Sequence, residues 1–342
     1  MIHFDCDYMA GAHPEVLKAI VDCNYDQTPG YGCDPYQDKA KALIRQACDQ
    51  PDAQVWLLTG GTQTNATVID GLLHGTDGVL CTETAHINVH EAGAIEIFGH
   101  KVITLPSHDG KLSADDLKGY LTEFYADDTN EHMVAPGAVY ISFSTELGTL
   151  YSLAELQALS DICRQYRLPL YVDGARLGHA LAASTDVTLP QLAALADVFY
   201  IGGTKMGALC GEAVVCTNPA LLPRFFTLMK AHGAVMAKGK LLGAQFAALF
   251  TDDLYLRIGR HTVRLALRLR QTLEARGYKA FIDSPTNQQF FTLPNTVIDR
   301  LLPHATFEYW GARGAVESKV RFVTSWETTD ADIDQLAQLL DA

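Results

Sequence analysis

The sequence predicts an α/β fold with a mostly parallel sheet in a large domain, followed by a small C-terminal α+β domain. Short apolar segments recur through the first 250 residues, and stretches with the apolar spacing of a helix separate them. This alternation is typical of a parallel sheet that helices cover on both faces. Near residue 250 the pattern changes to one long amphipathic helix. We therefore expect the domains to comprise residues 1–250 and 251–342.

Seven short apolar segments are the expected strands of the large sheet. In chain order they are Val55–Leu58, Val79–Cys81, Val102–Leu105, Val139–Phe143, Leu170–Val172, Val198–Ile201 and Ala213–Cys216. Glycines break the chain after the first strand, and a helix is expected at Thr62–Leu73. Further helices are expected near Glu91–Phe98, after the N-capping Ser113, and along the leucine-rich face that begins at Leu153.

The C-terminal region begins with a long helix, from about Asp252 to Arg276, that Gly277 ends. Leucines 265, 269 and 273 share one face of this helix. Strands are expected at Gln289–Leu293 and Lys319–Thr324, with a final helix from about Thr329. Helix, strands and helix together predict the small α+β domain.

The charge of the chain argues against two classes of partner. The 342 residues include 26 Lys and Arg against 40 Asp and Glu, a net charge of −14. Nucleic acid and anionic membrane surfaces are therefore not expected partners. No apolar run approaches the roughly 18 residues of a membrane span, and the start of the chain has no signal-peptide pattern. We expect a cytoplasmic protein whose Cys81, Cys163 and Cys216 are buried free thiols.

Polar residues follow five of the predicted strands. In a parallel sheet these strand ends share one edge, where ligands bind. Gly61 and Thr62 stand at a helix start, where backbone N–H groups can hold a phosphate, although a simple strand–helix turn has the same pattern. Asp173 and Lys205 follow two other strands and are poorly placed as surface charges. A phosphate site, a lysine for a Schiff base and an acid for a pyridinium nitrogen are the parts of a pyridoxal phosphate enzyme. A buried Asp–Lys ion pair is the structural alternative.

These segments resemble the threonine aldolase and β-eliminating lyase family of fold-type-I pyridoxal phosphate enzymes. The strongest match is Val172-Asp173-Gly174-Ala175-Arg176-Leu177, and the resemblance extends from Asp7 to about Val323. Further matches are Gly61–Asn65, His86-Ile87 with Glu91-Ala92-Gly93, and Tyr31–Pro35. The resemblance implies a fold-type-I α/β enzyme, a lyase of amino acid metabolism, that binds pyridoxal phosphate and an amino acid substrate.

The family pattern also implies roles for single residues. Lys205 would form the Schiff base, Asp173 would pair with the ring nitrogen and His86 would stack on the ring. Gly61, Thr62, Arg176 and Lys238 would also contact the cofactor, Lys238 from a neighbouring subunit. Arg321 and Arg176 would bind the substrate carboxylate, and Cys6 and Tyr31 would line the substrate site. A homodimer or homotetramer with the site at a subunit interface follows from this pattern.

Two departures from the family leave the substrate open. Cys6-Asp7-Tyr8 replaces Ser-Asp-Thr, and Ser144-Thr145-Glu146 replaces the Asn-Thr-His whose histidine lies near the substrate's β-hydroxyl. We expect retro-aldol cleavage of a β-hydroxy-α-amino acid to glycine and an aldehyde, with Glu146 as a catalytic residue. The alternatives are β-elimination and a catalytically silent relative. His86 and His90 have a spacing that could bind zinc, but no third ligand is evident and no metal is expected.

Overall fold

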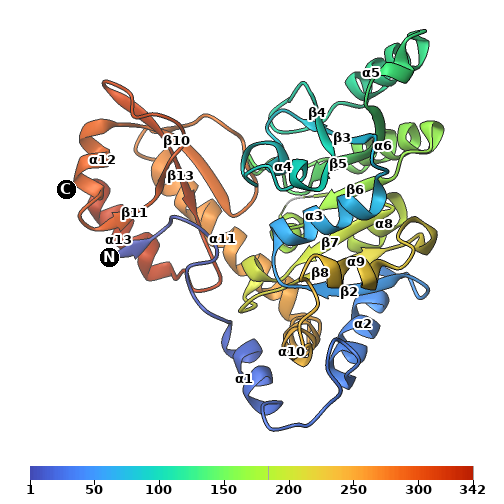
Figure 1. The fold of residues 1–342 in the computed structure, drawn as a ribbon. Helices are drawn as coiled ribbons and strands as arrows, with labels where there is room; N and C mark the ends of the chain where they lie inside the picture. The colour runs from blue at the N-terminus through green and yellow to red at the C-terminus, as the bar shows by residue number, and fades with distance from the viewer. Residues whose placement is uncertain (184, 342) are drawn as a thin grey trace.

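The computed structural model, which describes residues 1–183 and 185–341, contains a seven-stranded sheet (Figure 1). Its strand order is β2-β8-β7-β6-β5-β3-β4, and β8 runs in the direction opposite to the other six strands. The strands are β2 (Gln54–Leu58), β3 (Asp77–Thr82), β4 (Lys101–Leu105), β5 (Ala135–Ser142), β6 (Leu170–Asp173), β7 (Val198–Gly202) and β8 (Glu212–Cys216). All seven predicted strands are present, and the prediction of a mostly parallel sheet is confirmed.

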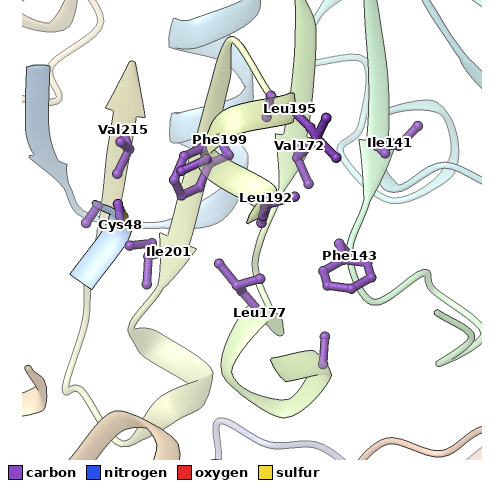
Figure 2. Close-up of a cluster of buried hydrophobic side chains, with 14 of the residues drawn as sticks. Cys48, Ile141, Phe143, Val172, Leu177, Leu192, Leu195, Phe199, Ile201 and Val215 are labelled. Carbon is purple, nitrogen blue, oxygen red and sulfur yellow. The ribbon is translucent and has the colours of Figure 1, made fainter. Parts of the chain in front are cut away.

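Both faces of this sheet are buried, which explains its nearly continuous apolar strands. Ile141, Val172, Phe199 and Ile201 pack on one face (Figure 2), and alternate residues such as Tyr200 pack on the other. Helices α3, α4 and α9 pack on the second face, and the remaining helices before α11 contribute mostly to the first. The ten helices described before α11 are α1 (Pro14–Asp22), α2 (Pro35–Cys48), α3 (Gly61–Leu72), α4 (His86–Val89), α5 (Ala114–Ala126), α6 (Leu153–Tyr166), α7 (Leu177–Ala182), α8 (Leu189–Leu195), α9 (Phe225–Ala231) and α10 (Lys240–Leu249).

The C-terminal region has a smaller sheet of its own, in the order β12-β13-β10-β9. Its elements are α11 (Leu254–Glu274), β9 (Lys279–Ala280), β10 (Gln288–Pro294), α12 (Asn295–Leu301), β11 (Ala305–Thr306), β12 (Glu308–Tyr309), β13 (Glu317–Val323) and α13 (Asp330–Asp341). Strand β1 (Ile2–His3) pairs with β11, so both ends of the chain lie beside this region (Figure 1). A domain division at residue 250 stays a prediction.

Helix α11 joins the two regions. Its first turns, with Leu254 and Ile258, pack in the core of the large sheet. Its later turns, with Leu265, Leu269 and Leu273, pack against the small sheet together with Phe4. The predicted helix and its apolar face are confirmed. This one helix therefore contributes side chains to the hydrophobic clusters of both regions.

One predicted helix is wrong. The expectation of a helix near Glu91–Phe98 fails because Ala92 and Gly93 adopt φ angles of 52° and 74°, which a right-handed helix does not allow. Instead α4 ends at Val89, and only a short 3₁₀ turn follows at Glu96–Phe98. The break turns the chain so that Glu91 lies buried beneath His86.

Two other expectations concern burial and membranes. The thiols of Cys81, Cys163 and Cys216 are buried and unpaired, as predicted. Within residues 1–183 and 185–341, every helix is too short or too polar to cross a membrane.

Candidate active site

A cavity of about 310 Å³ opens at the edge of the large sheet where the parallel strands end. This is the position expected for a ligand in an open α/β sheet, and the volume suits a small molecule. Seven of the predicted site residues line it: Gly61, Thr62, His86, Glu146, Asp173, Arg176 and Lys205. The structure therefore brings the predicted site residues of five separate segments together around one cavity.

Asp173 stands at the end of β6 with only 4% of its surface exposed. Its Oδ2 accepts hydrogen bonds from Asn65 Nδ2 at 2.9 Å and from the Tyr140 hydroxyl at 2.7 Å, and its Oδ1 accepts from the backbone N–H of Ala175. Burial alone raises the pKa of Asp173, but His86 and the surrounding donors outweigh it and hold this pKa below its usual value. The group is therefore a fixed carboxylate at the wall of the cavity.

His86 begins α4 and is held by a second carboxylate. Its Nδ1 is 2.7 Å from Oε1 of Glu91, and the same oxygen accepts from Asn65 Nδ2 at 2.8 Å. Asn65 therefore links the carboxylates of Asp173 and Glu91. A carboxylate on Nδ1 sets the tautomer and ring orientation of a histidine, so this ring is fixed at the cavity wall.

Lys205 lies in a 3₁₀ turn, Thr204–Met206, that follows β7. Its Nζ is 5.7 Å from the centre of the Tyr8 ring. Burial and the nearby Arg176 guanidinium lower the pKa of Lys205, although Asp7, Asp173 and Glu212 act in the opposite direction. A lowered pKa increases the fraction of free amine, which is the form that attacks a carbonyl carbon.

Glu146 follows β5 and faces the same cavity. Its Oε1 accepts hydrogen bonds from the backbone N–H of His86 at 3.0 Å and from Ser142 Oγ at 2.6 Å. Burial raises the pKa of Glu146; Ser142 and two backbone groups partly oppose this, and Asp173 adds to it. The direction is the one required for a carboxylate that exchanges protons nearer neutral pH.

Gly61 and Thr62 form the first turn of α3, a helix of 12 residues that opens onto the cavity. Free backbone N–H groups and the positive end of the helix dipole lie there, which suits a phosphate. A side chain at Gly61 would approach the Tyr200 hydroxyl to 3.3 Å, so glycine keeps this corner open.

Arg176 lines the cavity but is already paired. Its Nε and one Nη donate to the two oxygens of Asp7, at 2.7 and 3.0 Å. Asp7 also accepts from Asn287 Nδ2 at 2.9 Å. Burial raises the pKa of Asp7, but Arg176 and Lys205 lower it by more, so this carboxylate remains ionised. Arg176 therefore has only part of its guanidinium free for a ligand.

Arg321 lies on β13 and is 8% exposed. It donates to Gln288 Oε1 at 2.8 Å and pairs with Glu308, while its Nε has no hydrogen-bond partner among the described residues. The side chain is not one of those that line the cavity. Its role toward the substrate stays a prediction.

Besides Arg321, three predicted residues do not line the cavity of the single chain: Cys6, Tyr31 and Lys238. Tyr31 and Lys238 are exposed, and both belong to segments that contact each other, since the Tyr31 backbone N–H donates to Ala237 O at 3.1 Å. Cys6 is partly buried beside Tyr8, which does line the cavity.

Other residues that build the site were not predicted from the sequence. Asn65 and Glu91 were present in the matched segments but had no assigned role, and Asp7 stood in the altered Cys6-Asp7-Tyr8 segment. Glu212 was not predicted because it begins a strand, whereas polar residues at a ligand site are expected after strands. In the described part of the chain, no group of three or more His, Cys, Asp or Glu side chains is arranged to hold a metal ion.

The arrangement fits pyridoxal phosphate. A buried ionised acid, a helix N-terminus kept open by glycine and a lysine with a lowered pKa face one cavity, and these are the partners of a pyridine nitrogen, a phosphate and an aldehyde. The fold and this site define a pyridoxal phosphate enzyme of fold type I.

Comparison with known proteins gives the family. Residues 4–296 match the family model described as beta-eliminating lyase, and the chain belongs to this family. It is 30% identical over 341 residues to a low specificity L-threonine aldolase from Pseudomonas sp., covering 98% of this chain and 95% of the relative. A similarly named protein from Pseudomonas aeruginosa is 29% identical over 98% of this chain and 95% of its own length.

Solved structures agree with this assignment. The threonine aldolase of Leishmania major is 40% identical, with a TM-score of 0.96 over 100% of this chain and 99% of that one. A single mutant of the aspartate aminotransferase of Thermus thermophilus has a TM-score of 0.71 at 12% identity, over 99% of this chain and 90% of that one, and shares the fold alone.

Proposed function

We propose that this enzyme cleaves β-hydroxy-α-amino acids of the threonine type to glycine and an aldehyde. The observation that carries the proposal is the common cavity of Lys205, Asp173 and Glu146: a nucleophilic amine, a fixed carboxylate and a carboxyl group that can exchange protons. When bound, pyridoxal phosphate supplies the electron sink for the Cα–Cβ bond that breaks. The names of relatives from two Pseudomonas sources support the same chemistry.

Each residue then has a separate task. Lys205 would hold the cofactor covalently, Asp173 would keep a proton on its ring nitrogen, and His86 would pack against the ring. Gly61 and Thr62 bind the phosphate through the start of α3. Arg321 and the free part of Arg176 bind the substrate carboxylate.

Glu146 takes the proton of the β-hydroxyl as the carbon–carbon bond breaks. The hydrogen bonds from Ser142 and from the backbone N–H of His86 both go to Oε1, which leaves Oε2 the less occupied oxygen. This oxygen is therefore the one that accepts the hydroxyl proton. Because Glu146 must be ionised to accept it and its pKa is raised, the activity should increase with pH as this group loses its proton.

A substrate panel tests the reaction. We expect L-threonine, L-allo-threonine and L-phenylserine to give glycine and an aldehyde, measured directly as products. Glu146→Gln should lower kcat/KM by about 10²-fold or more and remove the acid limb of the pH profile, since an amide accepts no proton at neutral pH. The exposed Glu83→Gln is the matched control. β-Elimination would instead be established if L-serine or cysteine conjugates gave pyruvate and ammonia and the hydroxy amino acids gave no glycine.

Tyr31 and Lys238 support a site shared between subunits of a homodimer or homotetramer. Both are exposed in the single chain and lie outside its cavity. The Nζ of Lys230 lies over the Tyr31 ring, 4.2 Å from its centre. We propose that Lys238 acts on the phosphate site of a second copy and that the enzyme works in the cytoplasm.

A mixing experiment tests the shared site. Lys205→Ala and Lys238→Ala are each expected to be weakly active alone. Random reassortment in a dimer would give about a quarter of the sites a full set of residues and so restore activity, because both defects fall in one site of each mixed dimer and leave the other site complete. Light scattering measures the subunit count. An active monomer, or no recovery on mixing, would contradict the proposal.

A further inference from the structure

Glu308 is a carboxylate of the chain itself that occupies the arginine assigned to the substrate. Glu308 lies on β12 and Arg321 on β13, and the two residues stand directly opposite each other in this antiparallel pair. Glu308 Oε2 accepts a hydrogen bond from Arg321 Nη2, and the two side chains form an ion pair. Opposite side chains in such a pair are within reach of each other because of the register. The contact is therefore built into the small sheet.

The ion pair uses a part of the guanidinium that a substrate carboxylate would need. Nε and Nη2 lie on the same edge of this planar group, and such an edge binds a carboxylate through two parallel hydrogen bonds. Glu308 takes Nη2, while Nε is buried and has no hydrogen-bond partner among the described residues. Nη1 donates to Gln288 Oε1 at 2.8 Å. A ligand carboxylate that binds this edge with both oxygens must therefore displace Glu308 from Nη2.

Arg176, the other arginine assigned to the substrate carboxylate, has a fixed partner instead. Its Asp7 partner accepts two hydrogen bonds from the guanidinium and a third from Asn287 Nδ2, and the Asp7 side chain is fully buried. The side chain of Glu308 is 41% exposed. A half-exposed carboxylate can turn into water, whereas a buried one has no such path without losing its partners. Of these two carboxylates, Glu308 is the one that can leave.

The two arginines belong to one connected group of side chains. Gln288, which accepts from Arg321, follows directly in sequence after Asn287, which donates to the carboxylate that pairs with Arg176. Burial and the charge of Arg176 lower the pKa of Arg321, whereas Glu308 raises it. Arg176 lines the cavity. Glu308 therefore neutralises a guanidinium that stands beside the ligand site.

We propose that Glu308 acts through Arg321, as an internal competitor of the substrate carboxylate. When the site holds no substrate, Glu308 pairs with the guanidinium; a bound substrate takes both nitrogens of its edge, and Glu308 turns toward water. Because substrate and glycine must both displace the same side chain, Glu308 weakens the binding of each and favours release of the product. This inference rests on the proposed function, in which Arg321 binds the substrate carboxylate.

Binding of glycine, the proposed product, tests the competition without turnover. Calorimetric titration of the holoenzyme should show that Glu308→Ala binds glycine at least about 3-fold more tightly than the wild type. Glu308→Gln should lie between them, because its amide oxygen still accepts from Arg321 but has no charge. Glycinamide has no carboxylate and should bind no more tightly to either variant. Glu317→Gln, at an exposed position of β13, is the matched control for the lost charge.

Steady-state kinetics with L-threonine give a second measurement. Glu308→Ala should lower KM by a similar factor and change kcat less, because the ion pair acts on binding. Arg321→Gln should raise KM. Adding Glu308→Ala to Arg321→Gln should then give no gain in affinity, because the competition requires the guanidinium.

The sign of the change separates competition from support. If Glu308 only holds Arg321 in place, its removal should raise the Kd of glycine and the KM of L-threonine. That result, or unchanged values, would overturn the proposal, as would an equal gain for glycinamide or a gain that persists with Arg321→Gln. A wild-type holoenzyme that releases no glycine from any hydroxy amino acid would instead overturn the proposed function, since the glycine titration does not depend on cleavage.

Discussion

Replacing Lys205 by alanine is expected to abolish covalent attachment of pyridoxal phosphate and to lower aldol cleavage by about 10³-fold or more. The ammonium of Lys205 faces the cavity from the turn after β7, and it is the one lysine among the described residues that line this cavity. Its lowered pKa favours the free amine needed for bond formation. The absorbance band of the bound cofactor should therefore disappear from the purified variant.

Borohydride reduction followed by peptide mapping identifies the attachment point directly. The label should lie on Lys205 in the wild-type protein. Lys205→Arg retains the positive charge but has no nucleophilic amine, so it should fail as completely as the alanine variant. Lys118→Ala, in an exposed part of α5, is the matched control. A label on another lysine, such as Lys238, would disprove the assignment.

The strands of the large sheet were predictable because both of their faces are buried. Neighbouring residues such as Tyr200 and Ile201 point to opposite faces, and both are buried. Each must therefore be apolar or have its polar group hydrogen-bonded, so the strands are short uninterrupted apolar segments in the sequence. The direction of β8 was not readable in this way. An antiparallel strand has the same composition as its parallel neighbours, and only its pairing with β2 and β7 shows its orientation.

That orientation explains why one site residue escaped prediction. The end of β7 carries Lys205, whereas β8 brings its first residue, Glu212, to the same edge. A search limited to residues after strands passes over such an acid. The helix expected near Glu91–Phe98 failed for a local reason, the positive φ angles of Ala92 and Gly93.

The partners of the predicted residues depend on contacts that no spacing reveals. Asp7 reaches Arg176 across 169 positions of sequence, and Asn65 reaches Asp173 across 108. Tertiary packing alone brings these pairs together, so the sequence indicated the residues that face the ligand better than those that hold them in place. Tyr31 and Lys238 are a different case, since their predicted roles involve a second copy of the chain.

Asp173→Asn is expected to retain the cofactor but to lose about 10²-fold or more of the cleavage rate. The carboxylate of Asp173 is held ionised by three hydrogen bonds and by His86, so it can keep a proton on the nitrogen of a bound pyridine ring. An asparagine of the same shape has no charge for this purpose. The ring would lose its proton, and the electrons of the broken carbon–carbon bond would lose their acceptor.

The matched comparison is Tyr140→Phe, which removes one donor to Asp173 at 2.7 Å and leaves the carboxylate in place. This variant should lose far less activity than Asp173→Asn, because two hydrogen bonds and the charge remain. Cofactor content by absorbance and thermal melting establish that both proteins are loaded and folded. If the Asp173→Asn protein contains cofactor and turns over near the wild-type rate, this carboxylate has no role in the mechanism. Only Asp173→Asn removes the charge, so equal losses of activity in the two variants would mean that Asp173 has a structural role.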